Sequence, residues 1–105
     1  MLYEFCEFFG IQYALGIPAN QVFQRRAEPR QKRLPRRYRR MQLPQRSFSS
    51  FRHRDRRWSH QRRICYKAAH TAAGTNLRFL ITNCAGHASD VFVFLQRPRR
   101  VREPY

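Results

Sequence analysis

The chain has few acidic residues. Its 105 residues include 6 Asp and Glu against 22 Lys and Arg, which gives a formal net charge of +16. The basic residues are 20 Arg and only 2 Lys. A compact chain with this charge repels itself, and a polyanion would neutralise the repulsion. Because the planar guanidinium group can hold two phosphate oxygens at once, the excess of Arg favours a nucleic acid as partner. The alternative is a coding bias toward Arg.

Cysteine is also scarce. Cys6, Cys65 and Cys84 cannot all pair, and none lies in a Cys-x2-Cys motif. This favours a reducing, cytoplasmic compartment, with the thiols acting as small buried apolar groups. His70 and His87 follow Cys65 and Cys84 at spacings that zinc modules do not commonly use, so we expect no metal site from them.

Long apolar runs are missing. The most apolar stretch, MLYEFCEFFGIQYALGIPAN, contains Glu4, Glu7 and Gln12 and has no basic residue before it. A signal peptide needs a positive start, and a membrane span needs about 20 apolar residues. We therefore expect neither export nor a membrane partner.

The order of the patterns predicts an α+β fold. Residues 2–9 have helical spacing that Gly10 should end, residues 11–17 read as an interior strand covered on both faces, and Asn20 is a candidate N-cap for a helix to residue 28. Residues 29–46 are predicted to be a basic linker, either a solvated arm or a broken helix. Residues 47–83 predict a β-rich region with Arg on its open face.

The stretch from residue 77 to 103 carries two kinds of periodicity. Leu77, Phe79 and Ile81 alternate as in a half-buried strand. After Gly86 the spacing becomes helical, so residues 84–105 are predicted to hold a helix. Its first apolar row is Ala88, Val91, Phe92 and Leu95, and its second row is Phe94, Arg97 and Val101.

Three segments carry a resemblance to a known family: YEFCEFFGIQYALGIPAN, KAAHTAAGTNLRFLITN and FVFLQR. They resemble the DDE transposases of bacterial insertion sequences, most of all the group labelled thirteen-eighty. The resemblance implies a ribonuclease-H-like fold in which three carboxylates hold two Mg²⁺ ions that cleave and join DNA. Residues 1–28 would then be part of that α/β core, and 47–83 part of a β-rich insertion.

The family motif Tyr-x2-Arg-x3-Glu is only partly retained. Phe94 stands at the Tyr position, Arg97 matches the Arg, and Val101 replaces the Glu; Glu103 lies two residues late. Ala69 also occupies a position where the family has Glu. The other two carboxylates are expected upstream of Met1. We therefore predict an internal transposase fragment with no catalytic residue, no metal ligand and no retained Mg²⁺, and with DNA but no small molecule as partner.

Ten residues are candidate nucleic-acid contacts. Arg97 and Phe94 come from the motif. A Trp among Arg residues can stack on an unpaired base, and the alternative is a Trp that covers a small sheet; this candidate group is Trp58, Arg57, Arg62 and Arg63. The charge run adds phosphate contacts or is a solvated arm; it consists of Arg36, Arg37, Arg39 and Arg40. The alternatives to a transposase fragment are a stand-alone basic nucleic-acid-binding module and a decayed reading frame.

Overall fold

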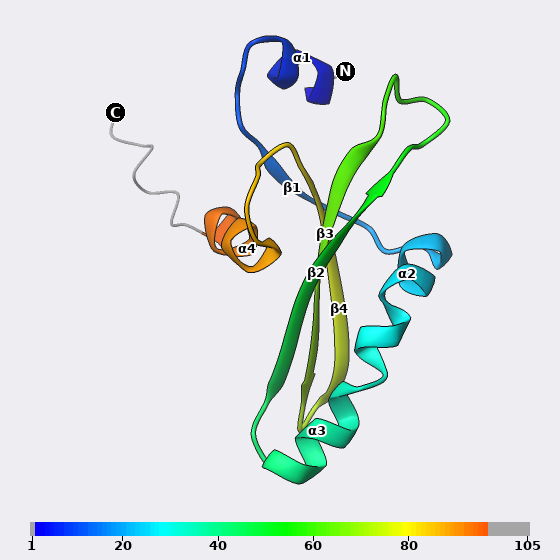
Figure 1. Ribbon diagram of the computed structural model, residues 1–105, viewed down its shortest axis with the longest axis vertical. Helices are drawn as coiled ribbons and strands as arrows, with labels where there is room; N and C mark the ends of the chain where they lie inside the picture. Colours follow the sequence, from blue (N-terminus) through cyan, green and yellow to red (C-terminus); the bar gives the residue numbers. More distant parts are fainter. Residues whose placement is uncertain (1, 97–105) are drawn as a thin grey trace.

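The computed structural model describes residues 2–96, which form four helices and four strands around one sheet (Figure 1). The α+β class is confirmed. The elements are α1 (Leu2–Phe8), β1 (Ala14–Ile17), α2 (Gln21–Gln31), α3 (Leu34–Met41), β2 (Gln45–His53), β3 (Arg62–Thr71), β4 (Gly74–Thr82) and α4 (Ala88–Gln96).

The sheet is antiparallel throughout, with the strand order β1-β4-β3-β2. The expected β-rich region is present as the long strands β2, β3 and β4. β3 and β4 form a hairpin whose last pair is Thr71 with Gly74. Gly74 has a φ of 114°, a conformation that residues with a Cβ rarely adopt, so glycine suits this tight turn.

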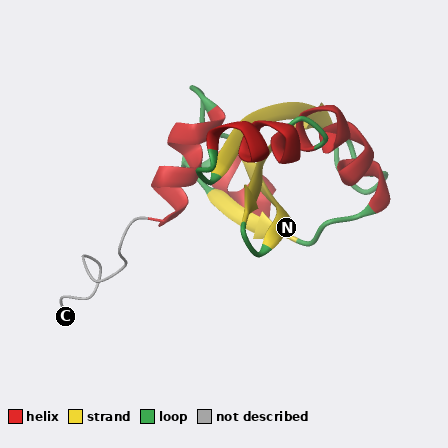
Figure 2. Cartoon of the chain, turned by 90° about the horizontal axis from the view of Figure 1, so that it is seen from below, coloured by secondary structure: helices red, strands yellow, loops and turns green. Residues whose placement is uncertain are grey.

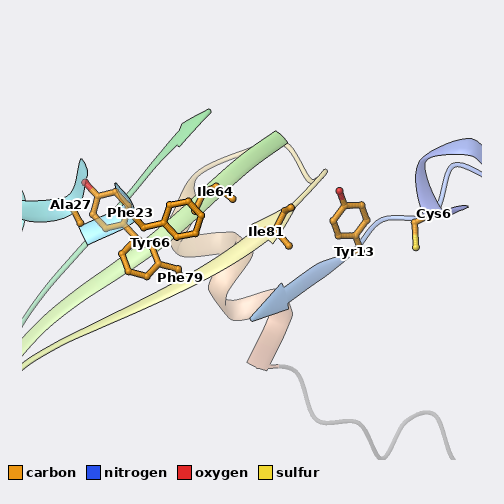
Figure 3. Close-up of a cluster of buried hydrophobic side chains, with 8 residues drawn as sticks. All are labelled: Cys6, Tyr13, Phe23, Ala27, Ile64, Tyr66, Phe79 and Ile81. Atoms are coloured by element: carbon orange, nitrogen blue, oxygen red, sulfur yellow. The ribbon is translucent and has the colours of Figure 1, made fainter. Parts of the chain in front are cut away.

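One face of the sheet packs against α2. Asn20 caps this helix as predicted, because its side chain accepts a hydrogen bond from the backbone of Phe23 at 2.9 Å. Phe23 and Ala27 of α2 lie beside apolar side chains of the two central strands, β3 and β4 (Figure 3). The buried cluster consists of Cys6, Tyr13, Phe23, Ala27, Ile64, Tyr66, Phe79 and Ile81.

The other face packs against α4. The predicted apolar row of this helix is confirmed, since Ala88, Val91 and Phe92 are buried and contact Cys65 and Leu80 of the sheet. In the view from below, α4 is the helix joined to the grey trace (Figure 2). Helices therefore cover both faces of the sheet, but α4 is short and covers only part of its face.

The segment 29–46 is more ordered than a solvated arm. α2 continues through Pro29 to Gln31, and α3 follows after a short turn. Pro35 suits the first turn of α3, where its missing N–H is not needed. Leu34 has no exposed surface, and its burial stabilises the docking of α3 by about 1.5–3 kcal/mol. The sequence prediction missed the apolar pair Leu34 and Tyr38, four residues apart, because Arg residues surround it.

The N-terminal elements also differ from expectation. Most apolar side chains of α1 and of the residue after it are exposed, with Phe5 at 56% and Phe9 at 60%. Cys6 is buried, and Tyr3 is half-buried against the core. The strand expected at 11–17 is limited to β1 and lies at the edge of the sheet, where it pairs with β4 alone. The expected cover on both faces holds in part: Ala14 is buried beneath α4 and Leu15 packs on the opposite face, whereas Gly16 is exposed.

Residues 11–13 are held by polar groups instead of strand pairing. Asn83 accepts a hydrogen bond from the Tyr13 backbone at 2.9 Å and donates one to the Ile11 carbonyl at 2.9 Å. The buried Thr82 hydroxyl donates to the Tyr13 carbonyl at 2.6 Å. The Thr-Asn pair that ends β4 therefore fixes the N-terminal segment to the sheet.

Candidate nucleic-acid interface

The predicted arginine run lies on α3 and is exposed. Leu34 and Tyr38 face the sheet, and the Tyr38 ring makes an edge contact with His70 of β3 at 5.0 Å between centroids. The helix leaves all its Arg side chains in solvent; these are Arg36, Arg37, Arg39 and Arg40. None of these side chains makes a hydrogen bond or ion pair within residues 2–96.

Arg33, which ends the preceding turn, extends this surface. Together with Arg36, Arg37 and Arg40 it forms a row at i, i+3, i+4 and i+7, which is one side of a helix. The row is about 10 Å long. Duplex DNA carries about six phosphate charges over that axial length, so the row can contact several phosphates at once. We call these four residues the α3 basic row. Arg33 was missed from sequence because the start of the helix was not apparent.

Trp58 is half-buried and packs against the buried cluster that lies between the sheet and α2. Its ring makes edge contacts with Tyr3 at 6.1 Å and with His53 at 5.8 Å between centroids. The guanidinium carbon of Arg62 lies 5.4 Å from the Trp58 ring and also 5.4 Å from the Tyr3 ring. The structure thus supports the alternative in which this Trp covers a small sheet.

Arg62 is engaged in a buried ion pair and does not lie on the open face that we expected. Its Nε and Nη2 donate to the two carboxylate oxygens of Glu7 at 2.8 and 2.9 Å. Its side chain is 1% exposed, and that of Glu7 is 23% exposed. The Tyr13 hydroxyl donates to the same carboxylate at 2.8 Å, and His60 lies 3.4 Å from it. Arg62 therefore joins α1 to β3 and is not available as a nucleic-acid contact.

The ion pair shifts the pKa values of its members. The hydrogen bonds from Arg62, and to a lesser degree the one from Tyr13, hold the pKa of Glu7 below its ordinary value against the opposing effect of burial. Burial and the neighbouring Glu7 carboxylate raise the pKa of Tyr13. The Glu7 carboxylate is therefore ionised at neutral pH and forms an ion pair with Arg62.

Arg63 and Arg57 also have partners. Arg63 donates to the Cys84 carbonyl at 3.0 Å and to the Gly86 carbonyl at 2.6 Å, so it fixes the loop that leads into α4. Arg57 lies 3.4 Å from the Asp55 carboxylate but keeps 86% of its side chain exposed. Arg57 is thus exposed, whereas Arg63 is half-buried.

The motif in α4 lies at the limit of the described residues. Phe94 is 38% exposed. Arg97, Val101 and Glu103 lie outside residues 2–96, so the position of the predicted phosphate contact at Arg97 is not described. Ala69 lies on β3, on the same face as Cys65.

A family model, described as transposase DDE domain group 1, matches residues 1–103. The chain belongs to this family. No curated protein and no solved structure shows a significant match to it. For a DDE transposase domain, DNA is the implied partner, and the exposed arginines of α3 are the described residues best suited to it.

The longest described helix has 11 residues, and no helix within residues 2–96 has the apolar length of a membrane span.

The described acidic residues of this DDE domain do not fit a magnesium centre. Glu7 is paired with Arg62, Glu28 with Lys32 and Asp55 with Arg57. Within residues 2–96, no three His, Cys, Asp or Glu side chains lie close enough to hold a metal ion together. Cys65 and His70 are five residues apart on one strand and so point to opposite faces of the sheet.

Proposed function

We propose that this chain is a DNA-binding part of a DDE transposase of the thirteen-eighty group of insertion sequences, with a ribonuclease-H-like origin. One observation carries the proposal: a chain of this family presents an unpaired arginine row on a helix that is docked firmly on the sheet. The row binds phosphate oxygens of the DNA backbone.

The α3 basic row is suited to backbone contact. Leu34 and Tyr38 hold the helix in place, so binding does not have to order the segment first. Each phosphate that an Arg neutralises releases counterions, which makes the affinity fall as salt rises. This contact is independent of sequence and would position the DNA, while sequence preference would require contacts to base edges.

The proposal includes binding without cutting by the isolated chain. In the intact family, two Mg²⁺ ions held by three carboxylates supply the chemistry of strand cleavage. The acidic residues that would hold them are not gathered within residues 2–96. Cleavage would therefore need carboxylates from outside this part of the chain.

The test of binding is fluorescence anisotropy with a labelled DNA duplex, titrated at several salt concentrations. The variant Arg36→Gln/Arg37→Gln/Arg40→Gln should reduce the slope of log affinity against log salt by about 3. The matched control, Arg25→Gln/Arg54→Gln/Arg56→Gln, removes the same charge elsewhere and should change the slope much less. Equal loss in both variants, or equal binding of wild type to heparin and DNA, would overturn a specific α3 site.

The test of cutting uses transposon-end DNA with Mg²⁺ or Mn²⁺. We expect bound but intact DNA, read on a denaturing gel. Metal-dependent cleavage by the purified chain would show that a catalytic set is present. A clear preference for the end sequence at fixed salt would instead favour a stand-alone binding module.

A further inference from the structure

Three basic side chains lie on the face of the sheet opposite α2 and α3. Cys65 of β3 pairs with Leu80 of β4, and α4 packs on both. Side chains two residues apart on a strand share a face, which places Lys67 and Arg78 on the α4 side. Arg46 joins them, since it pairs with Ala69, two residues beyond Lys67.

α4 leaves Arg46 and Arg78 exposed and Lys67 partly exposed. The contact of α4 with β2 is made through Phe92, whose ring lies 5.6 Å from that of Phe48. In the register, Lys67 pairs with both Phe48 and Arg78, and Arg46 lies two residues closer to the β3–β4 turn. Arg46 and Arg78 are exposed, and Lys67 is half-buried. We call these three residues the sheet basic patch. Asn76 is also exposed there and pairs with Ala69, so it adds an amide donor to the same face.

The patch is electrostatically unsatisfied. Lys67 and Arg78 are direct partners in the β3–β4 register, and like charges in that position repel each other. None of the four strands contains Asp or Glu. Within the described part of the chain, the three side chains make no side-chain hydrogen bond or ion pair. An anion bound between them would relieve the repulsion.

We propose that the sheet basic patch is a second surface for a nucleic-acid backbone, separate from the α3 basic row. The identity of the partner rests on the proposed function; the second surface goes beyond it. Residues 97–105 carry four Arg and one Glu, so their net charge has the same sign as the patch. Phosphate oxygens have the complementary charge, and the mixed Lys and Arg donors suit them.

The two surfaces point away from each other. α3 packs on the face of β3 that carries His70, and the patch lies on the face that carries Lys67. A nucleic acid bound to one surface leaves the other free. The chain can therefore hold two nucleic-acid segments, one on each side of the sheet.

The experiment compares four proteins, each with all 105 residues of the chain: wild type, Arg46→Gln/Lys67→Gln/Arg78→Gln, the α3 triple variant, and the control triple variant described above. Each is titrated with a labelled duplex and with a single strand of the same sequence. If a duplex occupies the patch, the patch variant should lower the slope of log affinity against log salt by about 2.7. The loss of affinity between 50 and 200 mM salt should then be smaller by a factor of about 40. If a single strand occupies it, the loss should be confined to that probe.

A bridging assay separates the two surfaces. Wild-type protein on immobilised duplex should capture a second, labelled nucleic acid, and the patch variant should keep the first but lose the second. Circular dichroism melts confirm that each variant is folded. A patch variant that binds and bridges like wild type would overturn the second surface and leave the α3 site intact. No salt-sensitive binding by wild type would overturn both, and capture of an acidic peptide but not of nucleic acid would assign the patch to another class of partner.

Discussion

The arginines at the two ends of the sheet differ in what they do. At the end near α1, Arg62 is buried on Glu7 and Arg63 holds the loop before α4. At the other end, the α3 basic row and the sheet basic patch have no partners among the described residues. All belong to the same excess of positive charge. The difference shows that composition favours a polyanion partner but does not indicate which guanidinium groups are free to contact it.

The largest effect should come from Arg62→Met. This change leaves Glu7 without its bidentate partner and removes the tie between α1 and β3. Breaking a buried pair costs about 3–5 kcal/mol, and the partial exposure of Glu7 places the expected loss of unfolding free energy at about 3 kcal/mol. Urea denaturation measures it. Nucleic-acid affinity per folded molecule should be unchanged, and a large loss of affinity at full stability would contradict the division between the two ends.

The next effect should come from Leu34→Ala. Leu34 is fully buried under α3, so a cavity there should lower the unfolding free energy by about 2–3 kcal/mol. The α3 basic row would lose its anchor, and the salt slope for DNA should fall. Hydrogen exchange of the α3 amides reads the local loss directly. Exposed Met41→Ala is the matched control and should leave both quantities close to wild type.

Lowering the pH should destabilise mainly the end of the sheet that carries the Glu7–Arg62 ion pair. The folded-state pKa of Glu7 is depressed, so its contribution to stability is present above the unfolded-state value of about 4.3 and is lost as pH falls through the folded value. Thermal melts from pH 6 downward should show a loss that is smaller in Glu7→Gln, which has already lost the charge. Equal pH dependence in both proteins would rule out this carboxylate as the source.

The smallest effect should be a gain in stability. Arg78→Glu replaces the like-charge pair with Lys67 by an opposite pair, which should add about 0.2–1 kcal/mol to the unfolding free energy. The same change should weaken nucleic-acid binding at the sheet basic patch. A rise in stability together with a fall in affinity would show that the repulsion between Lys67 and Arg78 is retained because both charges serve binding. Arg78→Gln should lie between the two proteins in both measurements.

Local sequence patterns predicted much of the fold. The Asn20 cap, the strand at residues 77–82 and the apolar row of α4 depend on neighbours within a few residues, and all three are confirmed. The expected burial of only one face of that strand is wrong, because its residues from Phe79 to Thr82 are buried on both faces. The segments that indicated the family are likewise contiguous, and the family match covers residues 1–103. The basic character of α3 was also evident from sequence, although its helix was not.

Contacts between distant residues decided the rest. Arg62 meets Glu7 across 55 residues, and no local pattern distinguishes it from its exposed neighbours. The sheet basic patch depends on the register that sets Lys67 opposite Arg78 and Arg46 beside Ala69. The sequence by itself determined that the chain carries a large unpaired positive charge on a transposase scaffold. Only the tertiary structure decided which charges are neutralised, because pairing depends on side chains brought together by folding.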